Sequence, residues 1–211
     1  MLISFDKLLS IDLRQAKERF QSKETNHKVS GEKLVIRLDG VSFSINLSNF
    51  KKPRDERVRE AMEDTAIELM RRLGAIAAYV VSDEINIFLG NYVPFNGREF
   101  KLVSVSSGIA SSYLSIKLSK PLYFDSRIVT LDLGEDIEYI IWRARLAAGN
   151  YLSNFTDKPF KEAIKLISNT NYIDCCGTVI KREWINSKPS EKVIRKYSAI
   201  DVISSWDTIY R

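Results

Sequence analysis

The chain has 211 residues, of which 45% are hydrophobic and 28% charged, so it is long enough to bury a substantial core. No apolar run approaches the roughly 18 residues that a membrane span needs, and the first residues lack the features of a signal peptide, so we expect a cytoplasmic protein with no membrane partner. The formal net charge of +5 permits a polyanionic partner, because Lys and Arg neutralise phosphates.

Histidine and cysteine are too scarce to carry the chemistry. The single histidine, His27, excludes a histidine-based triad and a zinc site with two histidines. The two cysteines, Cys175 and Cys176, are adjacent, so they form neither a disulfide framework nor spaced zinc ligands, and we expect them to be buried or incidental. Chemistry is left to carboxylates, hydroxyls, Lys, Arg or a bound metal.

The first 32 residues are predicted to form a helix and a linker. Residues Phe5–Phe20 suit an amphipathic helix, and a polar link follows it. The apolar, β-branched run Lys33–Leu38 is typical of a buried strand and stops at the turn residues Asp39 and Gly40. The core therefore begins at Lys33.

A helix and a hairpin are predicted next. Apolar residues recur at three- and four-residue steps over Arg54–Leu73, which indicates a helix with one side on a sheet. The short apolar runs Ala77–Val81 and Ile85–Leu89 flank the triplet Ser82-Asp83-Glu84. This pattern predicts a hairpin with acidic residues at its tip.

A second helix over Arg98–Leu118 and a strand over Phe124–Leu131 complete the order strand, helix, strand, strand, helix, strand. This order predicts an α+β fold, the ferredoxin-like βαββαβ arrangement with an antiparallel sheet and both helices on one face. We assign residues 33–152 to this domain and residues 153–211 to a C-terminal helical and mixed extension. Helical patterns recur at Ile137–Leu152 and Lys158–Ile167, and Val193–Ile203 is a candidate strand.

Two aspartates, Asp39 and Asp83, are expected to converge, because this topology places the end of the first strand beside the hairpin. Mg²⁺ prefers oxygen ligands and uses one or two carboxylates together with water and substrate phosphates. The alternative is that both are ordinary turn residues. Glu84 argues against that alternative, because adjacent acids without an evident local basic partner favour a bound cation.

Phosphate-binding candidates lie at the starts of elements. Hydroxyl and glycine residues follow the first strand, and basic residues precede or open the two helices, where helix dipoles favour anions. Each alone is typical of a solvated surface, whereas their shared placement favours phosphate binding. The candidates are Gly40, Val41, Ser42, Phe43, Ser44, the segment Lys51–Arg54, Arg98 and Lys101.

Six ordered blocks resemble the motifs of the tRNA-histidine guanylyltransferase family. They cover about Leu34 to Leu152 and read RLDGVSF (37–43), FKKPRDER (50–57), AYVVSDEI (78–85), FNGREFKLVS (95–104), YFDSR (123–127) and IWRAR (141–145). Single blocks are unspecific, but six in this order are specific. The resemblance implies a polymerase-like palm.

The resemblance also implies the reaction and its site. The family adds nucleotides to the tRNA 5′ end in the 3′-to-5′ direction: ATP or GTP activates the 5′-phosphate and pyrophosphate leaves, and the 3′-hydroxyl of an incoming GTP attacks the activated end. Catalysis would fall to Asp39, Asp83 and Glu84, with two Mg²⁺ ions on Asp39, the Gly40 carbonyl and Asp83. Nucleotide contacts would come from Asp39, Gly40, Val41, Ser42, Phe43, Ser44, Lys52, Asp55, Ser82, Asp83, Arg98 and Lys101.

The family further implies tRNA and nucleoside triphosphates as partners and a homotetrameric assembly. The chain departs from the family where Val41 replaces Arg, Ser44 replaces His and Val81 replaces Gln. An HINN block is absent at 144–150, so repair of 5′-truncated tRNA is as compatible as histidine-tRNA maturation.

Two other functions remain open from the sequence. One is a palm-derived RNA-binding protein that has lost turnover, and the other is a palm-type nucleotide cyclase. Basic residues of the C-terminal extension are either tRNA backbone contacts or an ordinary charged surface: Lys158, Lys161, Lys165, Lys181, Arg182, Lys188, Lys192, Arg195 and Lys196.

Overall fold

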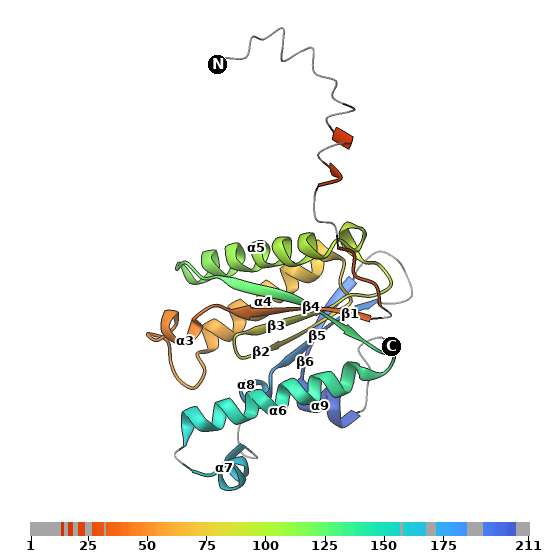
Figure 1. Cartoon of the computed structure of the whole chain (residues 1–211). Helices are drawn as coiled ribbons and strands as arrows, with labels where there is room; N and C mark the ends of the chain where they lie inside the picture. Colours follow the sequence, from red (N-terminus) through yellow and green to blue (C-terminus); the bar gives the residue numbers. More distant parts are fainter. Residues whose placement is uncertain are drawn as a thin grey trace, which may run out of the picture.

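A six-stranded antiparallel sheet with helices on both faces forms the centre of the computed structural model (Figure 1). The structure describes residues 14, 17–18, 21–23, 27–31, 33–156, 158–167, 172–184 and 192–205. The predicted N-terminal helix falls largely outside these residues. The strand order is β4-β1-β3-β2-β5-β6, with β1 (Lys33–Gly40), β2 (Ala77–Val81), β3 (Glu84–Phe88), β4 (Phe124–Leu131), β5 (Thr178–Trp184) and β6 (Lys192–Ser198).

The helices α4 (Glu56–Leu73) and α5 (Glu99–Leu118) cover one face of β1, β2, β3 and β4. Their order along the chain confirms the α+β fold and its ferredoxin-like palm. The helix α4 ends at Gly74, whose φ of 68° is readily adopted by a residue without Cβ. Its apolar side packs with Leu34, Ile36, Leu38, Ile85 and Ile87 of the sheet.

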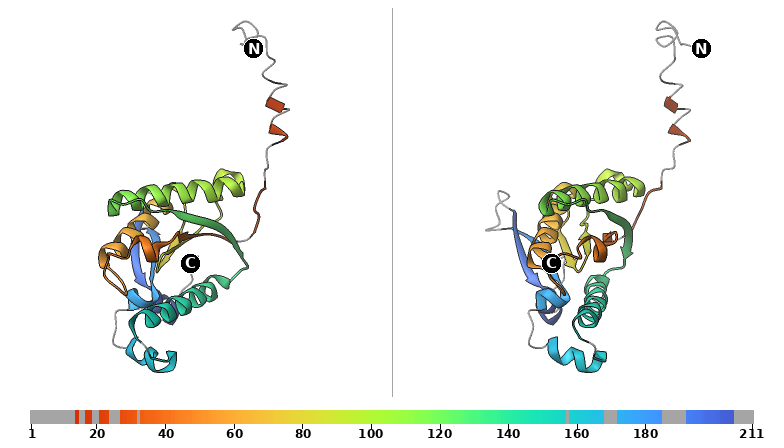
Figure 2. Two further views of the ribbon diagram at one scale, coloured as in Figure 1. Left: turned by 60° about the vertical axis from the view of Figure 1, so that its left-hand side comes forward. Right: turned by 90° about the vertical axis from the view of Figure 1, so that its left-hand side faces the viewer.

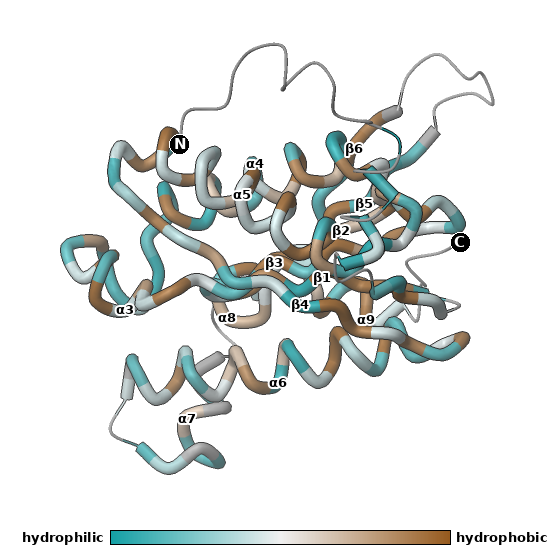
Figure 3. Tube along the Cα trace, turned by 45° about the horizontal axis from the view of Figure 1, so that its top comes forward, coloured by the Kyte–Doolittle hydropathy of each residue, from teal (hydrophilic) through white to brown (hydrophobic). Residues whose placement is uncertain are grey.

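The opposite face is covered by a long helix, α6 (Glu135–Phe155), together with α8 (Tyr172–Cys176) and α9 (Ala199–Ser205). Figure 2 shows these helices across the sheet from α4 and α5. Figure 3 shows apolar and polar residues alternating along α6, as expected for a helix with one buried side. Because both faces are covered, every residue of β2 and β3 is buried.

The C-terminal residues contribute strands to the same sheet. The strand β5 pairs with β2, and β6 pairs with β5. The candidate strand Val193–Ile203 is wrong in its second half, because the chain turns into α9 after Ser198, whose hydroxyl accepts from the Ile200 amide at 3.2 Å as a helix cap. The predicted domain boundary at residue 152 stays a prediction, although strands from both sides of it belong to one sheet.

The remaining elements are short: α3 (Phe43–Asn46), a 3₁₀ turn η1 (Pro94–Gly97) and α7 (Phe160–Ile167). The two cysteines are buried, as predicted, and are joined to each other in a disulfide. Among the described helices, none has the length and apolarity of a bilayer-spanning segment.

Candidate functional site

The C-terminal end of β1 meets the turn between β2 and β3. Asp39 lies opposite Glu84 in the strand register, and the Gly40 amide donates a hydrogen bond to the Asp83 carbonyl at 2.9 Å. The predicted convergence of Asp39 and Asp83 is thus present in the backbone. It follows from the antiparallel pairing of β1 with β3.

Two serines beside these aspartates have strained backbone conformations. Ser82 occupies the two-residue turn with φ of 55°, and Ser42 precedes α3 with φ of 56°. Residues other than glycine seldom adopt this region, and such conformations cluster at ligand-binding sites. The Phe43 ring also packs closely against the backbone of Gly40, because a Cβ on Gly40 would lie 2.5 Å from that ring.

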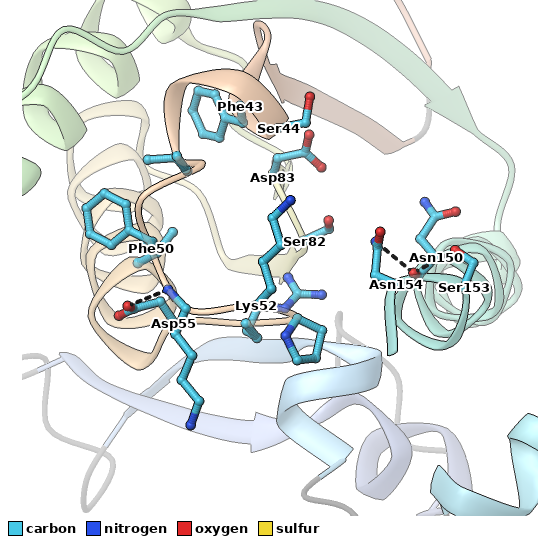
Figure 4. A pocket seen from close by; sticks show the side chains of 15 residues that line it. Phe43, Ser44, Phe50, Lys52, Asp55, Ser82, Asp83, Asn150, Ser153 and Asn154 are labelled. Carbon is cyan, nitrogen blue, oxygen red and sulfur yellow. Dashed lines mark hydrogen bonds between the residues drawn. The ribbon is translucent and has the colours of Figure 1, made fainter. Parts of the chain in front are cut away.

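A cavity of about 350 Å³ opens at this end of the sheet (Figure 4). Its walls come from α3, the segment before α4, the β2–β3 turn and the last turns of α6. Its lining residues are Phe43, Ser44, Leu47, Phe50, Lys51, Lys52, Pro53, Arg54, Asp55, Val58, Ser82, Asp83, Asn150, Ser153 and Asn154. The volume lies in the range of small-ligand pockets.

The cavity wall from α6 was not predicted. Asn150, Ser153 and Asn154 recur at three- and four-residue steps, which places them on one side of the helix end. This spacing was the only indication in the sequence that the three residues act together, and it does not show which other element the end of the helix contacts.

Residues of opposite charge line the cavity. Figure 4 shows the Lys52 side chain extending toward Asp83, with Ser44 and Ser82 close to that carboxylate. No hydrogen bond or ion pair engages the Asp83 carboxylate within the described part of the chain. This carboxylate is therefore available to a ligand or a cation.

Asp55 has a structural role at the cavity wall. It is the N-cap of α4, and its carboxylate accepts from the Arg57 amide at 3.0 Å and from the Lys51 amide at 3.1 Å. The Arg57 side chain also donates to it, and these bonds, that of the Arg57 side chain foremost, hold the pKa of Asp55 well below its usual range. Its predicted nucleotide contact stays a prediction.

Glu84 belongs to a buried network that the sequence did not reveal. Its carboxylate pairs with Arg37 at 3.2 Å, accepts from Asn86 at 2.8 Å and accepts from Nε and Nη2 of Arg143 on α6. Tyr139, also on α6, donates to Asn86 at 2.6 Å. The sequence offers no local basic partner for this acid, and tertiary packing supplies a distant one, because Arg143 is brought to it from 59 positions away.

Asp39 lies beside this network. Its carboxylate accepts from Arg37 at 3.3 Å, and its side chain keeps 36% exposure. Arg37 therefore contacts both Asp39 and Glu84. Neither Asp39 nor Glu84 is among the residues that line the cavity.

Two predicted phosphate contacts lie elsewhere. Arg98 and Lys101 are at the start of α5, at the opposite end of the sheet from α3 (Figure 1). The Lys101 ammonium lies 5.3 Å from the centre of the Phe95 ring. The backbone of Arg98 forms an isolated antiparallel β-bridge with that of Lys28. The structure of a single chain does not bring Arg98 or Lys101 to the cavity.

The candidate metal ligands suit magnesium better than zinc. In the described residues, no three His, Cys, Asp or Glu side chains gather as a metal site. Mg²⁺ needs only one or two carboxylates, since water and substrate phosphates complete its octahedron. Asp39, Asp83 and the Gly40 carbonyl, at neighbouring strand ends, fit that pattern.

Several basic residues of the C-terminal extension have internal partners. Lys196 pairs with Glu63 at 2.7 Å, Arg182 donates to the Met70 carbonyl at 2.9 Å and Arg195 pairs with Glu183 at 3.1 Å. Lys188 lies outside the described residues. These contacts account for part of the basic cluster without a nucleic acid.

Comparisons with known proteins bear on this site. A family model described as tRNAHis guanylyltransferase matches residues 17–132. Uncharacterized protein R259 of Acanthamoeba polyphaga mimivirus is 28% identical over 166 residues, which cover 60% of this chain and 56% of that protein. The chain thus spans little more than half the length of this curated relative.

Three solved structures share the fold. A bacterial tRNA(His) guanylyltransferase-like protein in complex with GTP has a TM-score of 0.75, 22% identity and coverage of 93% of this chain and 95% of that chain. The complex described with ATP has a TM-score of 0.72, 24% identity and coverage of 92% and 97%. The tRNA(His) guanylyltransferase of Saccharomyces cerevisiae has a TM-score of 0.60, 22% identity and coverage of 83% and 94%.

Proposed function

The chain belongs to the tRNAHis guanylyltransferase family, whose model matches over half of its length, and from this we propose that it is a nucleotidyltransferase acting on the 5′ end of tRNA. It adds GMP, or nucleotides specified by a template, in the 3′-to-5′ direction. Its substrates are a tRNA, ATP and GTP. It serves either histidine-tRNA guanylylation or the repair of tRNAs that lack 5′ nucleotides.

The cavity beside Asp83 is the observation that carries this proposal. It has room for a nucleotide and presents Lys52 and Asp83 with the hydroxyl residues Ser44 and Ser82. Lys supplies positive charge for a phosphate, and hydroxyls donate hydrogen bonds to its oxygens. A nucleoside triphosphate fits this combination of volume, charge and donors.

Asp39, Asp83 and the Gly40 carbonyl would hold the two Mg²⁺ ions. When bound, Mg²⁺ activates an attacking oxygen and stabilises the charge on a leaving phosphate. Arg37 orients the Asp39 carboxylate through its 3.3 Å hydrogen bond and is itself held by Glu84. The role of Glu84 in this proposal is therefore to position these groups.

The reaction has two phosphoryl-transfer steps. First, an oxygen of the tRNA 5′-phosphate attacks the α-phosphorus of a nucleoside triphosphate, a phosphoanhydride forms and pyrophosphate leaves. Then the 3′-hydroxyl of the incoming nucleotide attacks the activated 5′-phosphorus, loses its proton, and the activating nucleoside monophosphate leaves. Lys52 neutralises phosphate charge during these steps, and the Ser44 and Ser82 hydroxyls orient the phosphate oxygens.

Assembly and location complete the proposal. A single chain leaves Arg98 and Lys101 away from the cavity, which supports a homotetramer in which neighbouring subunits share one tRNA. The enzyme is placed in the cytoplasm, where tRNA and nucleoside triphosphates are available.

Incorporation of labelled GTP onto 5′-monophosphorylated tRNA tests the proposal. The assay uses the full chain, ATP and Mg²⁺, with tRNA that is either intact or lacks its first nucleotide. We expect Mg²⁺-dependent addition that Asp39→Asn and Asp83→Asn each reduce by at least about 100-fold. The matched control is Asp64→Asn, which changes a half-exposed aspartate of α4 that pairs with Lys117.

The outcomes separate the candidate functions. Preference for the truncated tRNA supports repair, and a cyclic nucleotide product would identify a cyclase. A folded wild type that binds tRNA but adds no nucleotide would show an RNA-binding protein and contradict the proposal. Equal activity of Asp83→Asn and Asp64→Asn would show that Asp83 has no role in catalysis.

A further inference from the structure

Arg54 is a partly buried cation at the wall of the cavity, and its Nε atom is buried. It lies between Pro53 and the N-cap Asp55 and lines the cavity of about 350 Å³. It also lines a smaller cavity of about 20 Å³ between α4, β2 and the segment around Gly177. Arg54 therefore shares the walls of both cavities with Ser82 of the β2–β3 turn.

Three buried arginine Nε atoms make no hydrogen bond within the described residues, those of Arg37, Arg54 and Arg59. Two of them still face a carboxylate, since Arg37 Nε lies 3.2 Å from Glu84 and Arg59 Nε lies 3.5 Å from Asp174. Arg54 forms no ion pair with any described residue. It differs from the other two in having no anionic partner within 4 Å among the described residues.

The surroundings of Arg54 make this arrangement costly. Burial lowers the pKa of Arg54, while the more distant carboxylates of Asp83 and Asp174 raise it. Asp174 is already paired with Arg59. A buried Nε–H group without a hydrogen-bond partner is unfavourable, so an anion that enters the cavity and pairs with this guanidinium gains binding free energy.

The shape of the guanidinium selects the kind of anion. Its planar fork of N–H donors matches two oxygens of one phosphate, whereas the Lys52 ammonium is a point charge. Ser44 and Ser82 add hydroxyl donors along the same wall. Two cations and two hydroxyls suit a chain of phosphates better than a single carboxylate.

We propose that Arg54 binds the polyphosphate of the nucleoside triphosphate in this cavity and is a main determinant of triphosphate affinity. The identity of the ligand as a nucleoside triphosphate rests on the proposed function, whereas binding of the polyphosphate to Arg54 does not. The segment Lys51–Arg54 is one of the phosphate-binding candidates of the sequence, and the structure singles out Arg54 within it. Lys51 instead donates its backbone amide to Asp55.

Calorimetric titration of the full chain with inorganic tripolyphosphate in the presence of EDTA tests this proposal. We expect Arg54→Met to weaken tripolyphosphate binding at least about tenfold, because a charge-assisted contact is lost, while guanosine affinity stays unchanged. The matched control is Arg72→Met, which removes an arginine of α4 that is 68% exposed and pairs with Glu68. Unchanged tripolyphosphate affinity in Arg54→Met would overturn the proposal.

A second variant covers the case in which Arg54→Met does not fold. Arg54→Lys keeps the charge and loses the fork, so we expect it to weaken tripolyphosphate binding about threefold or more without changing guanosine affinity. Wild-type tripolyphosphate affinity in Arg54→Lys would then reject the proposal. A wild type that binds tripolyphosphate through Arg54 but adds no nucleotide to tRNA would contradict the proposed function alone.

Discussion

The two faces of the sheet are built from different chemistry. The face under α4 and α5 is apolar, with Ile36, Leu38 and Ile87 fully buried. The face under α6 contains a buried polar network centred on Glu84. The apolar face stabilises the fold by burial, whereas the polar face supports the strand end that bears Asp39.

This difference explains how α6 is connected to the site. From α6, Arg143 pairs with Glu84 and Tyr139 donates to Asn86. Arg37 then links Glu84 to Asp39, because it pairs with both carboxylates. A shift of α6 on the sheet would disturb these contacts. The same helix supplies Asn150, Ser153 and Asn154 to the cavity, so its packing positions two parts of the site.

The largest expected effect follows from neutralising the centre of the polar network. Glu84→Gln leaves Arg37 and Arg143 buried without a full counter-charge, so we expect the free energy of unfolding to fall by about 3–5 kcal/mol. Denaturant unfolding at pH 7 measures it. Glu56→Gln is the control, because Glu56 is 76% exposed and its pair with Arg59 is a surface contact.

The Glu84 variant also distinguishes two roles for this residue. If Glu84 mainly balances the two arginines, stability and nucleotide addition fall together. Unchanged stability with lost nucleotide addition would contradict charge balancing and would favour the catalytic role that the sequence predicts.

A truncated side chain on the apolar face should destabilise the protein by an amount that does not depend on pH. Ile87→Ala removes buried methyl groups from the core under α4 and α5, and we expect a loss of about 2–4 kcal/mol. The loss in unfolding free energy should be the same at all pH values between roughly 6 and 8, because most carboxylates and lysines do not change protonation in that range. Ile116→Ala, at a side chain that is 78% exposed, should change stability little; a comparable loss there would weaken the comparison of the faces.

A smaller effect is expected where the polar network loses one hydrogen bond. Tyr139→Phe leaves the Asn86 side-chain oxygen without its 2.6 Å donor, and we expect a loss of about 1–2 kcal/mol in unfolding free energy. Tyr123→Phe is the control, since Tyr123 is 60% exposed. Equal stability of the two variants would show that the bond to Asn86 contributes nothing measurable.

The smallest effect lies at the edge of the apolar face, where Asp55 caps α4. Asp55→Asn keeps a capping oxygen but loses the charge interaction with Arg57, which is 73% exposed, so we expect a loss of at most about 1 kcal/mol at pH 7. The pKa of Asp55 is lowered in the folded state, so its stabilisation is complete above about pH 4, near the usual aspartate pKa, and is lost as the pH falls below that value. Unfolding curves of both proteins at pH 7, 4 and 3 check the sign: a difference that grows in acid would refute it.

The palm could be predicted from the sequence because its signals are local. The ranges predicted for β4 and α5 agree with their observed bounds within one residue. The fixed order of strands and helices then implied the antiparallel pairing that brings Asp39 to Asp83. The strand β5 was missed, because its two apolar residues Val179 and Ile180 are followed by three charged residues and do not form the apolar run of a buried strand.

By itself the sequence determined the family, the palm and the two aspartates at neighbouring strand ends, since short-range periodicity and ordered motifs carry that information. Only the tertiary structure decided which face α6 covers, that Arg143 balances Glu84, and that Arg54 lines the cavity without an ion pair among the described residues. These facts depend on contacts between residues far apart in the chain. Such contacts are set by the packing of whole elements, which local spacing does not encode.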